Sequence, residues 1–288
     1  MHPTDPEDTP STDGLQPGVL FGDYRLDRLL GEGGMGVVFK ASRADGTIVA
    51  LKIMKVQLSK DRRYQQRFTQ EARAARGVSN RHLVPVLDEG EVGGRSYLAM
   101  AFVDGRSLAE EIAERKTLDL DEVIRVARAL GEGLDSLHEK EIVHRDVKPS
   151  NVLMDRTGTV ALTDFGLAKG RAWTLLTKAG DIVGSVEYMA PERLQGEPAT
   201  TASDIYSFAC TVFECITGSP PFGGESAMRV AFAHMEEVPA DPCAVRPDLP
   251  KALGIAVLNG LEKEPGRRPR RAGEYAQLII AAAEGNRG

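Results

Sequence analysis

Cysteine is scarce in this chain of 288 residues, and the three cysteines present form no recognisable framework. No two of them have the Cys-x-x-Cys spacing, and an odd count gives no complete set of disulfides. Cys210 and Cys215 lie in a strongly apolar stretch, where small buried side chains are commoner than metal or redox chemistry. We therefore expect a reducing, cytoplasmic compartment.

An excess of basic residues and a long apolar run are also absent. The formal charge is 36 − 42 = −6, with both signs spread along the chain, which argues against nucleic acid as the main partner. No run of 18 or more apolar residues occurs, so no membrane segment is expected in this chain. The acidic start lacks the basic and apolar regions of a signal peptide. The hydrophobic fraction of 42% is ordinary for a globular protein, and the length allows one large domain or two lobes.

The first ordered motif is a glycine-rich turn. Residues 1–20 are rich in Pro, Thr, Asp and Gly and are predicted to be a disordered acidic tail. Residues 24–30 are then predicted to form a strand, glycines follow at 31, 33 and 36, and the β-branched and aromatic residues of 37–41 favour a second strand. The backbone N–H groups of such a hairpin can approach phosphate oxygens closely. Alone this signal is weak, since a merely tight hairpin would look the same.

A lysine and a glutamate form the second candidate pair. Lys52 interrupts a predicted buried strand over 47–54, and a lysine in such a strand needs a partner. The residues of 62–76 have helical composition. Glu71 lies close to the narrow apolar face of that helix and can turn toward Lys52, although most glutamates on such helices are simply solvated.

The richest stretch runs from His144 to Asn151 and contains Arg145, Asp146, Lys148 and the terminal carboxamide. It follows a helix that Asp119 or Asp121 can cap, and it precedes predicted strands over 152–154 and 160–162. The second strand leads to Asp164-Phe165-Gly166. Two carboxylates and a carboxamide thus meet at the ends of a short hairpin, an arrangement suited to holding a divalent cation and a hydroxyl.

The rest of the chain is predicted to be mainly helical. Further strands are predicted over 83–88 and 96–102, and the boundary between lobes is placed near residue 104. Residues 167–190 are a long polar loop, which is usually functional or mobile. Buried and amphipathic helices are predicted from Ser203-Asp204 to Ile216 and over 225–235, 252–262 and 272–283.

Together these motifs resemble the eukaryotic-type (Hanks-type) protein Ser/Thr kinases, especially the bacterial members, over residues 24–283. The resemblance implies an α+β, bilobal protein-kinase fold. Its N-lobe, an antiparallel β-sheet plus one helix, would span residues 21–103, and a mainly helical C-lobe would span 104–284, followed by a tail at 285–288. The implied activity is transfer of the γ-phosphate of ATP to Ser/Thr hydroxyls of proteins, with Mg²⁺, or Mn²⁺ in its place.

The resemblance also assigns roles to individual residues. Lys52 would hold the α- and β-phosphates, Glu71 would pair with it, and the glycine loop would cover the phosphates. The remaining residues assigned to the nucleotide are Gly31, Glu32, Gly33, Gly34, Gly36, Val38, Ala50, Met100 as gatekeeper, Ala101, Val103 and Leu153. Ala101 departs from the glutamate common in relatives, but its contact would be through the backbone.

The transfer chemistry is assigned to the catalytic stretch. Asp146 would orient the attacking hydroxyl, Lys148 would neutralise the transferring phosphoryl group, and Asn151 and Asp164 would bind the metal. Three roles are implied to be structural. Glu192 would pair with Arg268, Asp204 would hold the backbone of the catalytic loop, and His144 would pack beneath Phe165.

Regulation and the alternatives rest on the same resemblance. Arg145 would receive a phosphate on Thr177, or on Thr174, after autophosphorylation, and this would order the loop. Ser185 replaces a commoner threonine and keeps the hydroxyl. Protein substrates are expected, and a homodimer could carry out phosphorylation in trans. The competing interpretations are a pseudokinase that acts as a binding module and a small-molecule phosphotransferase.

Overall fold

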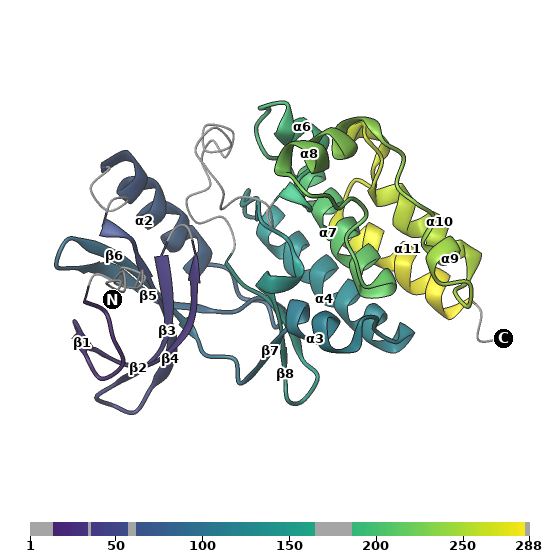
Figure 1. Ribbon diagram of the computed structural model, residues 1–288. Coiled ribbons are helices and arrows are strands. Elements are labelled where there is room, and N and C mark those ends of the chain that lie inside the picture. The colour runs from purple at the N-terminus through teal and green to yellow at the C-terminus, as the bar shows by residue number, and fades with distance from the viewer. Residues whose placement is uncertain (1–13, 34–35, 57–61, 165–185, 286–288) are drawn as a thin grey trace, which may run out of the picture. The chain divides into compact units, whose positions relative to one another are not determined.

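The computed structural model describes residues 14–33, 36–56, 62–164 and 186–285 (Figure 1). The chain divides into two compact units. The first comprises residues 1–69 and 86–102, and the second comprises 70–85 and 103–288. The predicted division into lobes at residue 103 stays a prediction.

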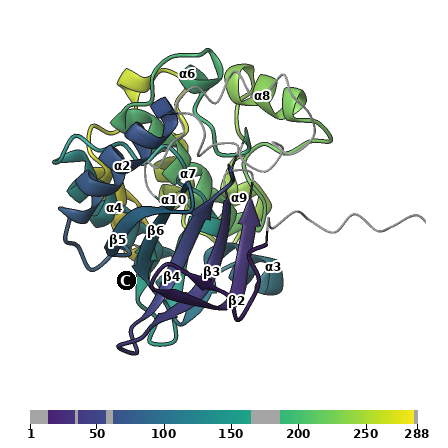
Figure 2. The ribbon, with the colours of Figure 1, turned by 90° about the vertical axis from the view of Figure 1, so that its left-hand side faces the viewer.

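The first unit is built on a six-stranded antiparallel sheet (Figure 2). Its order in space is β1 (Leu20–Phe21), β2 (Tyr24–Gly33), β3 (Gly36–Arg43), β4 (Ile48–Met54), β6 (Arg95–Ala101) and β5 (Val86–Val92). Helix α2 (Arg62–Arg76) lies between β4 and β5 in the chain. Because β2, β3 and β4 are joined in sequence by short turns, this half of the sheet is a meander.

One face of the sheet forms the core of the first unit. Alternate residues of β3 and β4, such as Phe39, Leu51 and Ile53, are almost completely buried there. Leu15 joins this core, and Leu20 pairs with Arg25 in the sheet. Packed chain therefore begins before the predicted end of the tail at residue 20, because an apolar side chain in the polar segment finds a place in the core.

The second unit is mainly helical and also carries a small sheet. The sheet orders β7 (Gly105–Ser107), β8 (Val152–Asp155) and β9 (Val160–Leu162). The longer helices are α3 (Leu108–Arg115), α4 (Leu120–His138), α7 (Thr201–Thr217), α8 (Ala227–Glu236), α10 (Lys251–Gly260) and α11 (Ala272–Glu284). The short helices are η1 (Pro149–Asn151), α6 (Pro191–Leu194), α9 (Pro242–Val245) and η3 (Pro265–Arg267). Helix α7 is buried over most of its length and contacts α4, α10 and α11 (Figure 1).

Local sequence explains where these helices begin and end. Ser107 and Asp119 cap α3 and α4 through reciprocal capping boxes with Glu110 and Glu122. Helix α7 ends at Gly218, which has a φ of 82°. A Cβ at this position would lie 2.6 Å from the carbonyl oxygen of Lys116, so a side chain there would meet both strain and a clash.

The predicted fold class is confirmed, since an antiparallel sheet unit and a mainly helical unit are present. Helix α2 has the predicted bounds, and α7 begins at Thr201, two residues earlier than predicted, because Thr200 supplies the cap. The strand predicted over 83–88 begins only at Val86. Leu83 instead bridges Leu162. Strands β1 and β7 are too short to leave a periodic signal and were not predicted. In the parts of the chain that the structure describes, no helix is long and apolar enough to span a bilayer.

Candidate functional site

The loop that carries the catalytic candidates is held by a buried aspartate. Asp204, in the first turn of α7, is 1% exposed. Its carboxylate accepts the backbone N–H groups of His144 at 2.7 Å and Arg145 at 2.8 Å, and it bonds Nε2 of His138 at 2.8 Å. Arg145 has a φ of 68°, a conformation that non-glycine residues rarely adopt without surrounding support. The structural role expected for Asp204 is confirmed.

His144 joins this loop to the strand that follows it. The ring is completely buried, and its Nε2 lies 3.0 Å from the carbonyl oxygen of Thr163, so Nε2 carries the proton. Nδ1 then accepts the backbone N–H of Asp146 at 3.2 Å. Burial lowers the pKa of His144, which keeps this neutral tautomer in place. His144 is a structural residue, while Phe165, its expected neighbour, lies outside the described residues.

Direct contacts bring Asp146, Lys148 and Asn151 together. The Nζ of Lys148 lies 3.2 Å from Oδ2 of Asp146. Nδ2 of Asn151 donates to that same oxygen at 3.0 Å and to the backbone carbonyl of Asp146 at 2.8 Å. A cation and an amide thus orient one carboxylate, as a group that must accept or direct a hydroxyl proton requires.

The donor set beside Asp146 fits a divalent cation. Because Nδ2 of Asn151 is used by Asp146, the carboxamide oxygen is the atom of Asn151 that can bind a metal. The backbone N–H of Thr163 donates to the carbonyl of Asn151 at 2.9 Å, which brings the next residue, Asp164, alongside. Asp164 has a φ of 60°. Hard oxygen donors of this kind suit Mg²⁺, which is commonly held by one or two carboxylates plus water and substrate phosphates. Among the described residues, no group of three or more His, Cys, Asp or Glu side chains could hold a metal alone.

The first unit contains the glycine hairpin between β2 and β3, in which Gly33 and Gly36 are the last paired residues before the turn. A Cβ on Gly36 would lie 2.2 Å from the carbonyl oxygen of Ile53, so this position has no room for a side chain. Gly31 and Gly33 have open space around them. Gly34 lies outside the described residues. Glu32, between these glycines, lies 3.6 Å from Nζ of Lys55.

Strand register explains how a lysine fits into an apolar strand. Leu51 and Ile53 point to the buried face, so half-buried Lys52 points to the other face. Directly paired residues of antiparallel strands share a face. Val38 and Leu98 are paired with Lys52, and Ala50 is paired with Met100. One face of the sheet therefore collects the nucleotide candidates Val38, Ala50, Lys52 and Met100. Ala101 pairs with Val49 on the core face.

Glu71 contacts a residue that was not its expected partner. Its Oε1 accepts a hydrogen bond from Nη1 of Arg145 at 2.6 Å, within the second unit. The expected pair with Lys52 joins the two units and stays a prediction, as do the adenine contacts of Val103 and Leu153, which belong to the second unit. The phosphorylation candidates Thr174 and Thr177, together with Ser185, lie outside the described residues.

The expected pair of Glu192 and Arg268 is confirmed and is buried. Nη1 and Nη2 of Arg268 each lie 2.8 Å from a different carboxylate oxygen of Glu192. Burial by itself raises the pKa of Glu192, but the hydrogen bonds and charge of Arg268 outweigh it and lower the pKa overall. Sequence reasoning missed the contact of His138 with Asp204, for which the only signal was a histidine at the end of a helix.

Comparison with known proteins gives the class to which this fold and site belong. The protein kinase domain family matches residues 24–268. The serine/threonine-protein kinase PknH of Mycobacterium bovis is 38% identical over 268 residues, covering 93% of this chain and 44% of that relative. PknE of the same organism is 38% identical over 266 residues, covering 92% of this chain and 47% of PknE. The chain thus spans about half the length of these curated relatives.

A solved structure gives the same result. The kinase domain of Mycobacterium tuberculosis PknI aligns with a TM-score of 0.76 and 28% identity, covering 94% of this chain and 100% of that domain. The chain therefore belongs to the protein kinase domain family, which confirms the resemblance to bacterial Hanks-type kinases.

Proposed function

We propose that this chain is an ATP- and Mg²⁺-dependent protein kinase that phosphorylates Ser and Thr hydroxyls of proteins. The observation that carries the proposal is the carboxylate of Asp146, which Lys148 and Asn151 orient, next to the oxygen donors Asn151 and Asp164. The names of PknH and PknE, both serine/threonine-protein kinases, support the acceptor class.

The second unit carries the residues proposed for transfer. Asp146 accepts or directs the proton of the attacking hydroxyl, and Lys148 offsets negative charge on the phosphoryl group. Asn151 and Asp164 hold Mg²⁺, or Mn²⁺ in its place. When bound, the metal neutralises charge on the phosphate oxygens. Asp204 and His144 act through this loop by keeping its backbone in place.

The first unit carries most of the residues proposed to bind ATP. The exposed backbone at Gly31 and Gly33 supplies N–H groups for phosphate oxygens, and Lys52 supplies the fixed cation. The apolar positions proposed for adenine are Val38, Ala50, Met100 and, from the second unit, Leu153. The backbone groups of Ala101 and Val103 are proposed to recognise the adenine edge.

Activation is proposed to follow autophosphorylation at Thr177, or at Thr174, in trans within a homodimer in the cytoplasm. Arg145 is the proposed receiver of the new phosphate. Because Arg145 bonds Glu71 in this structure, phosphate binding would have to compete with that ion pair.

The test measures transfer of labelled γ-phosphate from ATP to Ser- and Thr-containing protein substrates. Asp146→Asn is expected to lower the rate at least about 10³-fold while ATP binding persists, because only the positioning and proton acceptance are lost. Asp248→Asn, which removes a carboxylate from the exposed pair with Arg246, is the matched control and should leave the rate unchanged. Nucleotide binding without turnover in the unmutated chain would indicate a pseudokinase. ATP consumption without any phosphoprotein would indicate a small-molecule phosphotransferase.

A further inference from the structure

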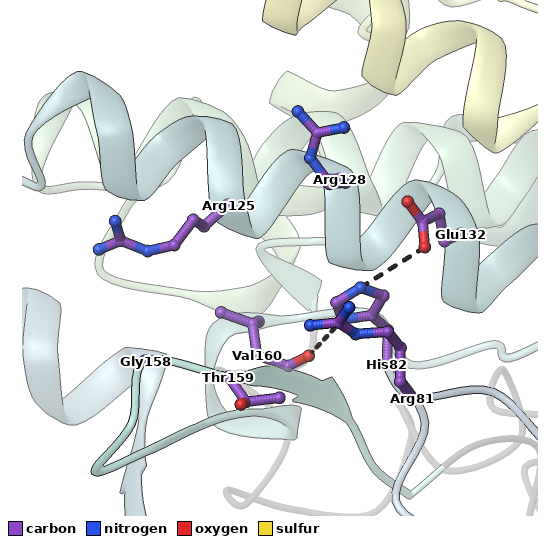
Figure 3. Close-up of a pocket in the computed structure, with 8 residues that line it drawn as sticks. All are labelled: Arg81, His82, Arg125, Arg128, Glu132, Gly158, Thr159 and Val160. Atoms are coloured by element: carbon purple, nitrogen blue, oxygen red, sulfur yellow. Dashed lines mark hydrogen bonds and ion pairs between the residues drawn. The ribbon is translucent and has the colours of Figure 1, made fainter.

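The second unit contains an open pocket of about 160 Å³, lined mainly by charged and polar residues, that shares no lining residue with the candidate functional site (Figure 3). Three segments meet there: the exposed face of α4, the residues that precede β5, and the turn between β8 and β9. Arg125 and Arg128 project from α4, and Arg81 lies beside His82 on the facing segment. We call this pocket the arginine pocket.

The walls of the arginine pocket are held by hydrogen bonds on every side. The carbonyl of His82 accepts the N–H of Leu162 at 2.8 Å, and its Nδ1 lies 2.8 Å from the carbonyl of Val160. Nδ2 of Asn80 donates to Oγ of Ser136 on α4 at 2.6 Å. His82 is 7% exposed, so it forms a fixed floor. The backbone segments that carry the lining residues are therefore held against one another, and a ligand would have to order only the arginine side chains.

The pocket has an excess of positive charge. Three arginines line it against one carboxylate, Glu132, whose Oε2 lies 3.5 Å from Nε2 of His82. Arg125 lies 3.7 Å from Glu122, but Arg115 already holds that carboxylate with both of its terminal nitrogens. No described residue forms an ion pair or hydrogen bond with the side chain of Arg81 or Arg128. This local excess stands out in a chain with a net charge of −6.

Charge and size together restrict the ligand. Like charges gathered on one surface attract an anion, and the planar guanidinium group matches the geometry of phosphate and carboxylate oxygens. The pocket volume of about 160 Å³ is below the value of about 300 Å³ at which small-molecule sites usually begin. A phosphoryl group fits this volume. A phosphate offers three acceptor oxygens and close to two negative charges, so the positive charge of the three lining arginines attracts it.

We propose that the arginine pocket binds a phosphorylated Ser or Thr side chain within an acidic polypeptide segment. The chain itself contains a segment of this composition. Residues 1–13 carry four carboxylates, four Ser or Thr hydroxyls and no Lys or Arg. These residues lie outside the described part of the chain, and their composition makes them a suitable probe. The proposal concerns binding alone and does not depend on the proposed transfer reaction.

The experiment uses the full chain with Asp146→Asn, so that its own activity does not alter the probe. Fluorescence anisotropy measures binding of a labelled peptide of residues 1–13, once with phosphate on Thr9 and once without. The phosphorylated peptide should bind at least about tenfold more tightly, and inorganic phosphate should compete with it. Arg125→Gln with Arg128→Gln should weaken its binding by about tenfold or more, with a smaller salt dependence. Arg81 lies on the segment that faces α4, and Arg81→Gln alone should also weaken binding of the phosphorylated peptide.

The matched control is Arg267→Gln with Arg270→Gln. These two arginines are also exposed, are three residues apart, and lose the same charge outside the pocket. Thermal unfolding of each variant checks that the fold is retained, which is expected because glutamine is a good helix former. Equal binding of the two peptides, no binding at millimolar concentration, or an equal loss in the control pair would overturn the proposal. If only the kinase assay fails, the pocket can still bind the phosphorylated peptide, so the two proposals are tested separately.

Discussion

Replacing Glu192 by glutamine should destabilise the helical unit far more than an exposed carboxylate would. The side chain of Arg268 has an exposed fraction of 0%, and both of its terminal nitrogens bond Glu192. The same guanidinium also donates to the backbone carbonyls of Ala202, Glu262 and Lys263. Glu192→Gln keeps the shape but leaves a buried cation without its anion.

The expected magnitude follows from that burial. Removing one partner of a buried ion pair typically lowers the free energy of unfolding by about 3–5 kcal/mol. Arg268→Met should have an effect of similar size, because it also strands three carbonyl groups. The double variant should lose less than the sum of the two single variants, by about 2 kcal/mol or more, since the second change removes a charge that the first left unpaired.

Urea denaturation at pH 7, followed by circular dichroism at 222 nm, measures these free energies and reports chiefly on helix. Asp104→Asn is the control, because Asp104 and Arg156 form an exposed pair at 3.3 Å with exposed fractions of 65% and 81%. Its effect should stay below about 0.5 kcal/mol. A change below about 1 kcal/mol for Glu192→Gln, or strictly additive single changes, would refute the assignment of this pair as a coupled buried contact.

Two further predictions address pH and the glycine hairpin. Burial lowers the pKa of His234 to about 3, so below about pH 6.5 the unfolded chain takes up a proton that the folded chain refuses. The free energy of unfolding should therefore fall by about 1.4 kcal/mol per pH unit on acidification. Urea titrations at pH 6.5, 5.5 and 4.5 measure this slope, and His234→Gln should reduce it. An unchanged slope in the variant would contradict the assignment to His234. Gly36→Ala should lower the free energy of unfolding by about 2 kcal/mol or more, because its Cβ would lie 2.2 Å from the carbonyl oxygen of Ile53. Gly31 has open space around it, so Gly31→Ala should change the free energy of unfolding by less than about 0.5 kcal/mol. Melting temperatures of the two variants compare them directly, and equal values would count against the clash.

Much of the fold was predictable because its elements carry strong periodic signals. Helix α2 has good helix formers without glycine or proline, and its bounds match the prediction. Strands β8 and β9 were also found from short apolar runs bounded by polar residues. In contrast, β7 is a three-residue strand that exists only because β8 pairs with it. Such a strand cannot be predicted from a local sequence pattern.

The candidate site shows the same division. The resemblance to protein kinases predicted the pair of Glu192 with Arg268 and the contacts of Asp204 with the catalytic loop, and both are present. The contact of Glu71 with Arg145 joins residues 74 positions apart, and the arginine pocket collects residues from three distant segments. Composition and spacing do not predict such long-range contacts, because these contacts depend on how the elements pack.

The contacts of Asp204 attach the catalytic loop to the buried core of the second unit. Its carboxylate belongs to the buried helix α7, yet it fixes two successive backbone amides of the loop, one of them at the left-handed Arg145. If this loop opened alone, the buried carboxylate of Asp204 would lose the backbone N–H groups that it accepts, which is energetically costly. Its geometry should therefore persist up to the cooperative unfolding of the helical unit. Heat and denaturant would then abolish the geometry of this loop and the core together, in a single step.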